Sequence, residues 1–226
     1  MKKSDYTDLF HTGFSLDPKR TGLLVIDMQY ATACRQTGLG KLLTESGQEE
    51  LGSYRFDRIE QWVIPNISTL LSLFRTNRLK VIYVTIGSQL PDYSDLAPHL
   101  KSLAEAVGNR KGLPSHEILR ELKPEQGEWI VNKTTMSAFN SSPIDSVLRS
   151  GGIEYLVFTG VSTNSCIEGT ARDAADKGYR CVIAEDACGA GSQKLHEATL
   201  ENFGRLLGRV EKTETIIREL QEHSGL

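Results

Sequence analysis

Short apolar runs alternate along the chain with segments of helical spacing, and this alternation limits the possible folds more than any other feature. The runs are rich in β-branched residues and show no strict change between apolar and polar positions, which is typical of strands buried on both faces. These runs cover residues 22–26, 80–86, 129–131, 155–159 and 180–184. Strands that alternate with helices pair in parallel, so the sequence predicts an α/β fold with helices on both faces of one sheet.

Apolar side chains recur every three or four positions in residues 56–75, which predicts a helix with one buried stripe. The stripe consists of Ile59, Val63, Ile67, Leu70, Leu71 and Phe74. Shorter helical patterns lie at residues 144–148, 167–177 and 194–207. The C-terminal segment predicts a short edge strand and then a helix capped by Thr213. Residues 31–54 and 88–114 are polar or contain glycine and proline, and we interpret them as long loops, with a helix inside the second as an alternative.

Composition describes a soluble globular protein and argues against several classes of partner. The 226 residues carry a formal net charge of −3 at pH 7, which gives no bulk electrostatic reason to expect nucleic acid. No apolar stretch approaches the roughly 18 residues that a membrane span requires, and no apolar run follows the N-terminal lysines as in a secretory signal. The four cysteines form no CxxC pair, so we expect reduced thiols and a cytoplasmic protein.

A cysteine, Cys166, follows the fourth predicted strand in the stretch "TGVSTNSCIEGT". Gly160 permits a tight turn there, and a helix begins directly afterwards. The amino end of a helix stabilises a thiolate, and the free backbone N–H groups of such a turn can bind an oxyanion. The thiol is therefore either a nucleophile or a side chain packed in the first turn of a buried helix.

Asp27 and Lys133 also follow strands, and each has two interpretations. Asp27 ends the apolar run "LLVID", where the cost of desolvation implies a partner or a purpose. It is either a proton carrier or a cap for the following loop. Lys133 ends "WIVNK" and is either part of the same site or a solvated surface lysine. The carboxyl ends of parallel strands converge, so a thiol, a carboxylate and an ammonium group meet in one crevice if these strands are neighbours.

Three segments carry a resemblance to the isochorismatase-like cysteine hydrolase superfamily: "LLVIDMQ", "KTTMSAF" and "GVSTNSCIEGTARDAADKGYRCVIAEDAC". The resemblance runs from about residue 21 to residue 220. It implies one domain over residues 1–226, with residues 1–20 as an N-terminal extension. The implied fold is a three-layer α/β/α, Rossmann-like domain with a central, mostly parallel sheet of about six strands. A homodimer or homotetramer without a cofactor is implied as well.

The same resemblance implies a catalytic triad of Asp27, Lys133 and Cys166. The Cys166 thiolate would attack an amide or ureide carbonyl and form a thioester, Asp27 would take and return the proton, and Lys133 would hold both groups in register. The backbone N–H groups of Ser162 and Cys166 would bind the oxyanion, and the bond between Val161 and Ser162 would be cis.

Four further residues are expected to contact the substrate: Gln29, Tyr30, Phe139 and Asn164. Gln29 is expected to form a hydrogen bond with the substrate or with the pair of Asp27 and Lys133. Phe139 is expected to form an apolar wall of the pocket, with packing in the core as the alternative.

The retained Cys166 favours cleavage of a C–N bond, because isochorismatases proper cleave a vinyl ether without requiring this thiol. The sequence around Cys166 is most similar to that of superfamily members that act on carbamoyl or ureide groups, such as the hydrolases of biuret or ureidoacrylate. Nicotinamidases of the superfamily hold a metal with an Asp and two His after the second strand, where this chain has His99 alone, so no metal site is expected. The sequence thus predicts a cysteine hydrolase of a small amide, ureide or carbamoyl compound, without nucleic acid or membrane as partner. A vinyl ether hydrolase and a non-catalytic binding protein remain the alternatives.

Overall fold

A single parallel sheet organises the protein, which we describe from a computed structural model that covers residue 6 and residues 13–224. The strand order is β3-β2-β1-β4-β5-β6, and all neighbouring strands run parallel. The strands are β1 (Thr21–Ile26), β2 (Lys80–Ile86), β3 (Trp129–Lys133), β4 (Tyr155–Val161), β5 (Arg180–Gly189) and β6 (Arg209–Glu211). The predicted six-stranded α/β fold is confirmed.

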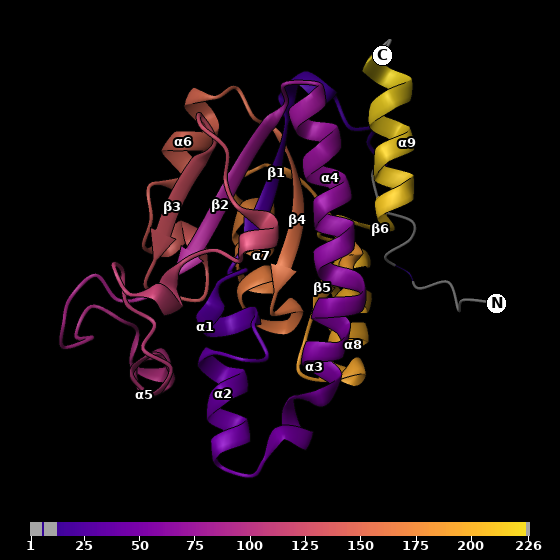
Figure 1. Ribbon diagram of the computed structural model, residues 1–226. Coiled ribbons are helices and arrows are strands. Elements are labelled where there is room, and N and C mark those ends of the chain that lie inside the picture. The colour runs from indigo at the N-terminus through magenta and orange to yellow at the C-terminus, as the bar shows by residue number, and fades with distance from the viewer. Residues whose placement is uncertain (1–5, 7–12, 225–226) are drawn as a thin grey trace.

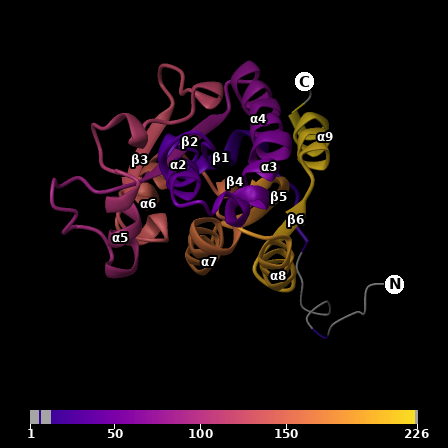
Figure 2. The ribbon, with the colours of Figure 1, turned by 60° about the horizontal axis from the view of Figure 1, so that its bottom comes forward.

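Helices cover both faces of this sheet, as Figures 1 and 2 show. The α-helices are α1 (Tyr30–Ala33), α2 (Gly38–Glu45), α3 (Ser53–Arg58), α4 (Ile64–Thr76), α5 (Pro98–Ala106), α6 (Ile144–Ser150), α7 (Glu168–Asp176), α8 (Gln193–Gly204) and α9 (Thr213–Ser224). Helices α3, α4 and α9 lie on one face, and α6, α7 and α8 lie on the other. Two apolar cores result. Leu23 and Val25 of β1 belong to the first core, on the side of α3, α4 and α9, whereas Leu24 and Ile26 belong to the second core, on the side of α6, α7 and α8. The central strands β1, β2 and β4 are mostly apolar because both of their faces are buried, whereas the edge strands β3 and β6 are only partly buried.

The predicted helical stripe forms a long helix in which a π-helical turn, Ile59–Val63, joins α3 to α4. All six stripe residues are buried, as predicted. The interpretation of residues 31–54 as a loop is wrong, because α2 and most of α1 lie within this range. Thr213 is the first residue of α9, and its N–H and hydroxyl both donate to Asp186 Oδ1, at 2.9 and 2.7 Å. The cap of α9 is therefore supplied by the carboxylate of Asp186.

Part of the predicted N-terminal extension packs against the C-terminal helix. Leu16 is buried, and its N–H donates to Glu219 Oε1 of α9 at 2.8 Å. Residues 1–5 and 7–12 of the extension lie outside the described part of the chain. Within the described part, none of the helices combines the length and apolar character that a bilayer crossing requires.

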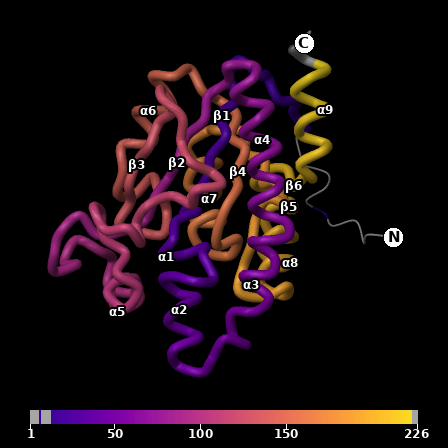
Figure 3. The backbone as a smooth tube through the Cα atoms, viewed as in Figure 1, coloured from indigo at the N-terminus to yellow at the C-terminus, as the bar shows by residue number. Residues whose placement is uncertain are grey.

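The carboxyl ends of the strands point toward α1, α2 and α5, which lie beyond that end of the sheet (Figures 1 and 3). Two backbone features shape this end. Asp27, directly after β1, has a φ of 55°, a left-handed conformation that Asp tolerates better than most residues. Gly160 in β4 has a φ of 112°, and a Cβ atom there would lie 2.0 Å from the carbonyl oxygen of Ile26. Only glycine therefore allows β4 to approach the end of β1 this closely.

We expect Gly160→Ala to lower the free energy of unfolding by at least about 3 kcal/mol, because it adds both steric overlap and backbone strain. Denaturant unfolding followed by circular dichroism measures this loss. Gly191→Ala is the matched control, since a Cβ there meets nothing within 4 Å. Equal unfolding midpoints for the two variants would contradict the close approach of β1 and β4.

Candidate active site

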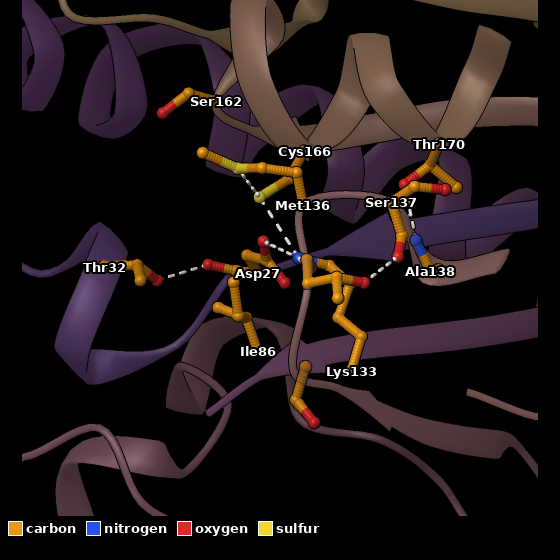
Figure 4. A network of polar contacts seen from close by, with 12 residues as sticks. Asp27, Thr32, Ile86, Lys133, Met136, Ser137, Ala138, Ser162, Cys166 and Thr170 are labelled. Atoms are coloured by element: carbon orange, nitrogen blue, oxygen red, sulfur yellow. Dashed lines mark hydrogen bonds and ion pairs between the residues drawn. The ribbon is translucent and has the colours of Figure 1, made fainter. Parts of the chain in front are cut away.

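Three side chains from three strand ends meet at the carboxyl end of the sheet (Figure 4). Lys133 Nζ lies 3.0 Å from Asp27 Oδ2 and 3.1 Å from Cys166 Sγ. The residues are 0%, 2% and 7% exposed for Lys133, Asp27 and Cys166. Lys133 Nζ also donates to the carbonyl oxygen of Thr135 at 3.2 Å, so all three of its N–H donors have partners. The convergence that the strand ends predict is present in the structure.

The backbone of Asp27 is held by hydrogen bonds, and one oxygen of its carboxylate has no partner. Its backbone N–H donates to Val84 O of β2 at 2.8 Å, and its backbone carbonyl accepts a short hydrogen bond from the Thr32 hydroxyl. Within the described chain, Oδ1 has no hydrogen-bond partner although it is buried. The carboxylate lines the same cavity as the thiol of Cys166. One oxygen therefore pairs with Lys133, and the other can accept a proton or a hydrogen bond from an N–H group.

Cys166 lies in a π-helical turn, Thr163–Ile167, that leads from β4 into α7. The peptide bond between Val161 and Ser162 is cis, in agreement with what the resemblance implies. The sulfur lies 3.7 Å from Met136 Sδ. Cys166 thus occupies the first turn of the helix, with the Ser162 turn directly before it.

The pKa values of the three groups shift in directions that their surroundings explain. Burial, together with the charge of Asp27, raises the pKa of the Cys166 thiol to about 12, and the charge of Lys133 opposes this only in part. Burial also raises the pKa of Asp27 despite the nearby ammonium group. Burial alone would lower the pKa of Lys133, but the charges of Asp27 and Cys166 outweigh it, and the pKa is raised. Burial and the Asp27 carboxylate therefore favour the thiol form at rest, in opposition to the helix end, which favours the thiolate.

A cavity of about 180 Å³ opens onto the thiol and the carboxylate, and α1, α2 and α5 each contribute residues to its lining. Most of its wall is apolar. The apolar side chains come mainly from the end of β2, with Ile86, and from the following segment, which contains α5 and contributes Leu96, Leu100, Leu103, Ala104 and Val107. Its size is below that of typical drug-sized ligand sites, so it suits a small molecule.

Arg55 of α3 also lines this cavity, and the sequence did not reveal it. The residue is 8% exposed, and its Nη1 donates to Ser162 Oγ at 2.6 Å. Its Nε and Nη2 donate to the carbonyl oxygen of Thr32 at 3.3 and 2.8 Å. Burial lowers the pKa of the guanidinium to about 10, so it remains charged at neutral pH. Arg55 follows no strand, and only the folding of α3 against the site brings it there.

Gln29 lies outside the cavity lining and contacts neither the ion pair nor the thiol. Its Oε1 accepts from the N–H of Ile86 at 2.9 Å, and its Nε2 donates to the carbonyl oxygen of His116 at 2.7 Å. Asn109 and His116 complete this buried cluster, in which their side chains lie 3.0 Å apart. Burial lowers the pKa of His116 to about 4, so its ring is neutral at pH 7. Gln29 thus links the end of β1 to the segment after β2 by hydrogen bonds. This differs from the prediction that it bonds to the substrate or to the pair of Asp27 and Lys133.

The described residues that line the cavity do not include Tyr30, Phe139 or Asn164. Phe139 packs into the second core, with its ring 5.8 Å from that of Tyr179, so the alternative of core packing holds. Tyr30 lines a separate cavity beside α2. The turn around Cys166 presents Ser165 instead of Asn164 to the site. Side-chain direction in a helical turn decides such placements, and sequence position alone does not give it.

A second arginine, Arg58, which is partly buried, and the buried His196 form hydrogen bonds next to the turn that carries Cys166. Arg58 Nη2 lies 2.8 Å from His196 Nε2, and Thr163 Oγ1 lies 2.8 Å from His196 Nδ1. Because arginine can only donate, Nε2 accepts, and Nδ1 carries the proton that is donated to Thr163. Burial lowers the pKa of His196 to about 4, consistent with a neutral ring. Among the described residues, no group of three or more His, Cys, Asp or Glu side chains is arranged to hold a metal ion.

Comparisons with known proteins agree with this architecture. Residues 21–215 match the sequence model of the isochorismatase domain family. The ureidoacrylate amidohydrolase RutB of Variovorax paradoxus (strain S110) is 30% identical over 219 residues, which cover 90% of this chain and 82% of that protein.

Two solved structures share the fold. A cysteine hydrolase from Pseudomonas syringae pv. phaseolicola 1448A gives a TM-score of 0.78 at 23% identity, covering 93% of this chain and 97% of that chain. N-carbamoylsarcosine amidase from Thermoplasma acidophilum gives a TM-score of 0.64 at 23% identity, covering 86% and 97%. At these identities the structural likeness concerns the fold alone.

We expect Asp27→Asn to lower the pKa of the Cys166 thiol, because the variant removes a negative charge that raises it. The thiolate ultraviolet absorbance, titrated against pH, measures this shift when each protein is compared with its own Cys166→Ala derivative. Asp57→Asn serves as control, since that carboxylate is exposed and pairs with Arg35. An unchanged thiol pKa in Asp27→Asn would show that the carboxylate does not act on the sulfur.

Proposed function

Since the chain belongs to the isochorismatase domain family, we propose that this hydrolase cleaves a C–N bond of a small amide, ureide or carbamoyl compound through a thioester on Cys166. One observation carries the proposal: Lys133 Nζ lies within 3.1 Å of both Asp27 Oδ2 and Cys166 Sγ, at the edge of a cavity of about 180 Å³. A thiol with an adjacent base and an orienting cation is the arrangement that nucleophilic catalysis requires.

The first half-reaction begins with the proton of the thiol. Asp27 Oδ1 accepts it, because that oxygen has no other partner in the described chain, and Lys133 stabilises the thiolate that forms. The sulfur then attacks the carbonyl carbon, and the backbone N–H groups of Ser162 and Cys166 bind the developing oxyanion. Asp27 returns the proton to the nitrogen as the C–N bond breaks, and ammonia or an amine departs.

The second half-reaction consumes one water molecule. Asp27 accepts a proton from the water, the hydroxide adds to the thioester carbonyl, and the C–S bond breaks. The sulfur regains its proton, so the enzyme returns to a thiol and a carboxylate. The sum is amide plus water giving a carboxylic or carbamic acid plus ammonia or an amine, without a cofactor.

The relatives support cleavage of a C–N bond over cleavage of an ether. RutB is named for the hydrolysis of ureidoacrylate, and the Thermoplasma structure is named as an amidase for N-carbamoylsarcosine. The small, mostly apolar cavity supports a small-molecule substrate. The homodimer or homotetramer that the resemblance implies, and the cytoplasmic location, stay predictions.

We expect Cys166→Ala to lower kcat for ammonia release by at least about a thousandfold, because no other group can form the thioester. An ammonia assay over small ureides, carbamates and primary amides measures this. Cys34→Ala is the matched control, because the Cys34 thiol is partly exposed and does not line the described cavity.

Two outcomes would contradict the proposed function. One is ammonia release at near the wild-type rate by a folded Cys166→Ala variant. The other is turnover of a vinyl ether to pyruvate without release of ammonia from any amide or ureide.

We expect kcat/KM to have an acid limb with its midpoint above 3.8, the ordinary pKa of aspartate, because burial raises the pKa of Asp27. Above the raised pKa the carboxylate can accept the proton of the thiol, and below it this capacity is lost. The pH profile of a neutral substrate measures the limb, with ellipticity recorded at each pH to confirm that the protein stays folded. A midpoint at or below 3.8 would exclude Asp27 as the base.

A further inference from the structure

The cavity holds a buried cation that the proposed chemistry does not use. Arg55 lines the cavity together with Asp27 and Cys166, whereas Lys133 is fully buried behind them and is not part of the lining. In the described chain Arg55 forms no ion pair with a carboxylate. A buried charge without an opposite charge is costly, and proteins retain one only where something compensates it.

The charges of the site leave one positive charge without an opposite charge. Asp27 contributes −1, and Lys133 balances it with +1 at 3.0 Å, which leaves the +1 of Arg55. Transfer of the thiol proton to Asp27 does not change this sum, because the thiolate replaces the carboxylate as the anion. The site is therefore positive by one unit through the whole proposed cycle. Most of its remaining wall is apolar, and the polar side chains there, among them Asn109 and Ser165, are neutral and do not balance that charge.

The guanidinium is fixed in place and still has donors available. Three of its five N–H donors bind Thr32 O and Ser162 Oγ, which leaves two, one on each terminal nitrogen, without a partner in the described residues. A guanidinium with available N–H groups on both terminal nitrogens is suited to a carboxylate, which accepts through two oxygens.

From these observations we propose that Arg55 binds a carboxylate of the substrate. The site then selects amides, ureides or carbamoyl compounds that carry a carboxylate near the scissile bond. The inference rests on the proposed function, since it names the class of substrate that the same cavity accepts.

A merely structural Arg55 would hold Ser162 and Thr32 and nothing more. Its loss would then lower turnover of acidic and neutral substrates by the same factor. A carboxylate-binding Arg55 affects the acidic substrates selectively and acts mainly through KM. Substrates that differ only in the carboxylate separate the two roles.

The first test compares matched substrate pairs in the ammonia assay. N-carbamoylglycine is paired with ethylurea, N-carbamoyl-β-alanine with propylurea, and succinamate with butanamide, so that a methyl group replaces the carboxylate each time. We expect the wild-type enzyme to prefer the acid of the best pair by about tenfold or more in kcat/KM. Arg55→Met should remove this preference, and Arg55→Lys should keep part of it because the charge remains.

Arg35→Met is the matched control, because Arg35 lies near the same helix but pairs with Asp57 and Glu60 on the surface. It should leave the preference unchanged.

The second test does not depend on turnover. Iodoacetate and iodoacetamide differ only in carrying a carboxylate or a carboxamide, and each alkylates a thiolate with loss of iodide. We expect the ratio of their rates at Cys166, measured by peptide mass spectrometry, to favour iodoacetate at least about fivefold more than the ratio for glutathione does. Arg55→Met should return the ratio to that of glutathione.

The outcomes separate the two proposals. If ammonia is released and Cys166 is alkylated, but the acid shows no preference and Arg55→Met lowers both members of a pair equally, only the inference about Arg55 fails. If wild-type Cys166 reacts with neither reagent, the thiol is not reachable from the cavity, and the proposed function falls together with the inference.

Discussion

The buried ion pair between Asp27 and Lys133 is the interaction on which the rest of the site depends. Taking an ion out of water costs on the order of several kcal/mol, so neither charge is stable at this depth without the other. The pair is fully formed at 3.0 Å, and the third N–H of Lys133 points to the sulfur of Cys166. Because the pair neutralises itself, a proton can pass from the thiol to the carboxylate without changing the net charge of the site.

The parallel sheet explains why such a pair can exist. Its strand order, β3-β2-β1-β4, places the ends of β1 and β4 side by side and leaves β3 close enough for the long side chain of Lys133 to reach across β2. The turn that carries the thiol is then fixed from two sides. Arg55 binds Ser162 Oγ from α3, and His196 binds Thr163 from α8. These contacts orient the turn without touching the sulfur.

The sequence could predict the parts of the site that depend only on where strands end. Asp27, Lys133 and Cys166 follow apolar runs, and the ends of parallel strands converge by topology alone. Arg55 could not be found in this way, because its approach to the cavity depends on how α3 packs. The same limitation explains Gln29, Phe139 and Asn164, whose positions beside the triad in sequence do not fix the direction of their side chains. Helix α2 was missed as well, because it is only eight residues long and contains Gly38 and Gly40, which disfavour a helix.

The central claim is that the sulfur of Cys166 becomes acylated with Asp27 and Lys133 as its partners. Single-turnover rapid quench with intact and peptide mass spectrometry tests it most directly, using any amide or ureide from which the enzyme releases ammonia. We expect a transient acyl adduct on the Cys166 peptide, with ammonia or an amine released before the acid product. Simultaneous release of ammonia and acid, with the Cys166 peptide unmodified at every quench time, would contradict it.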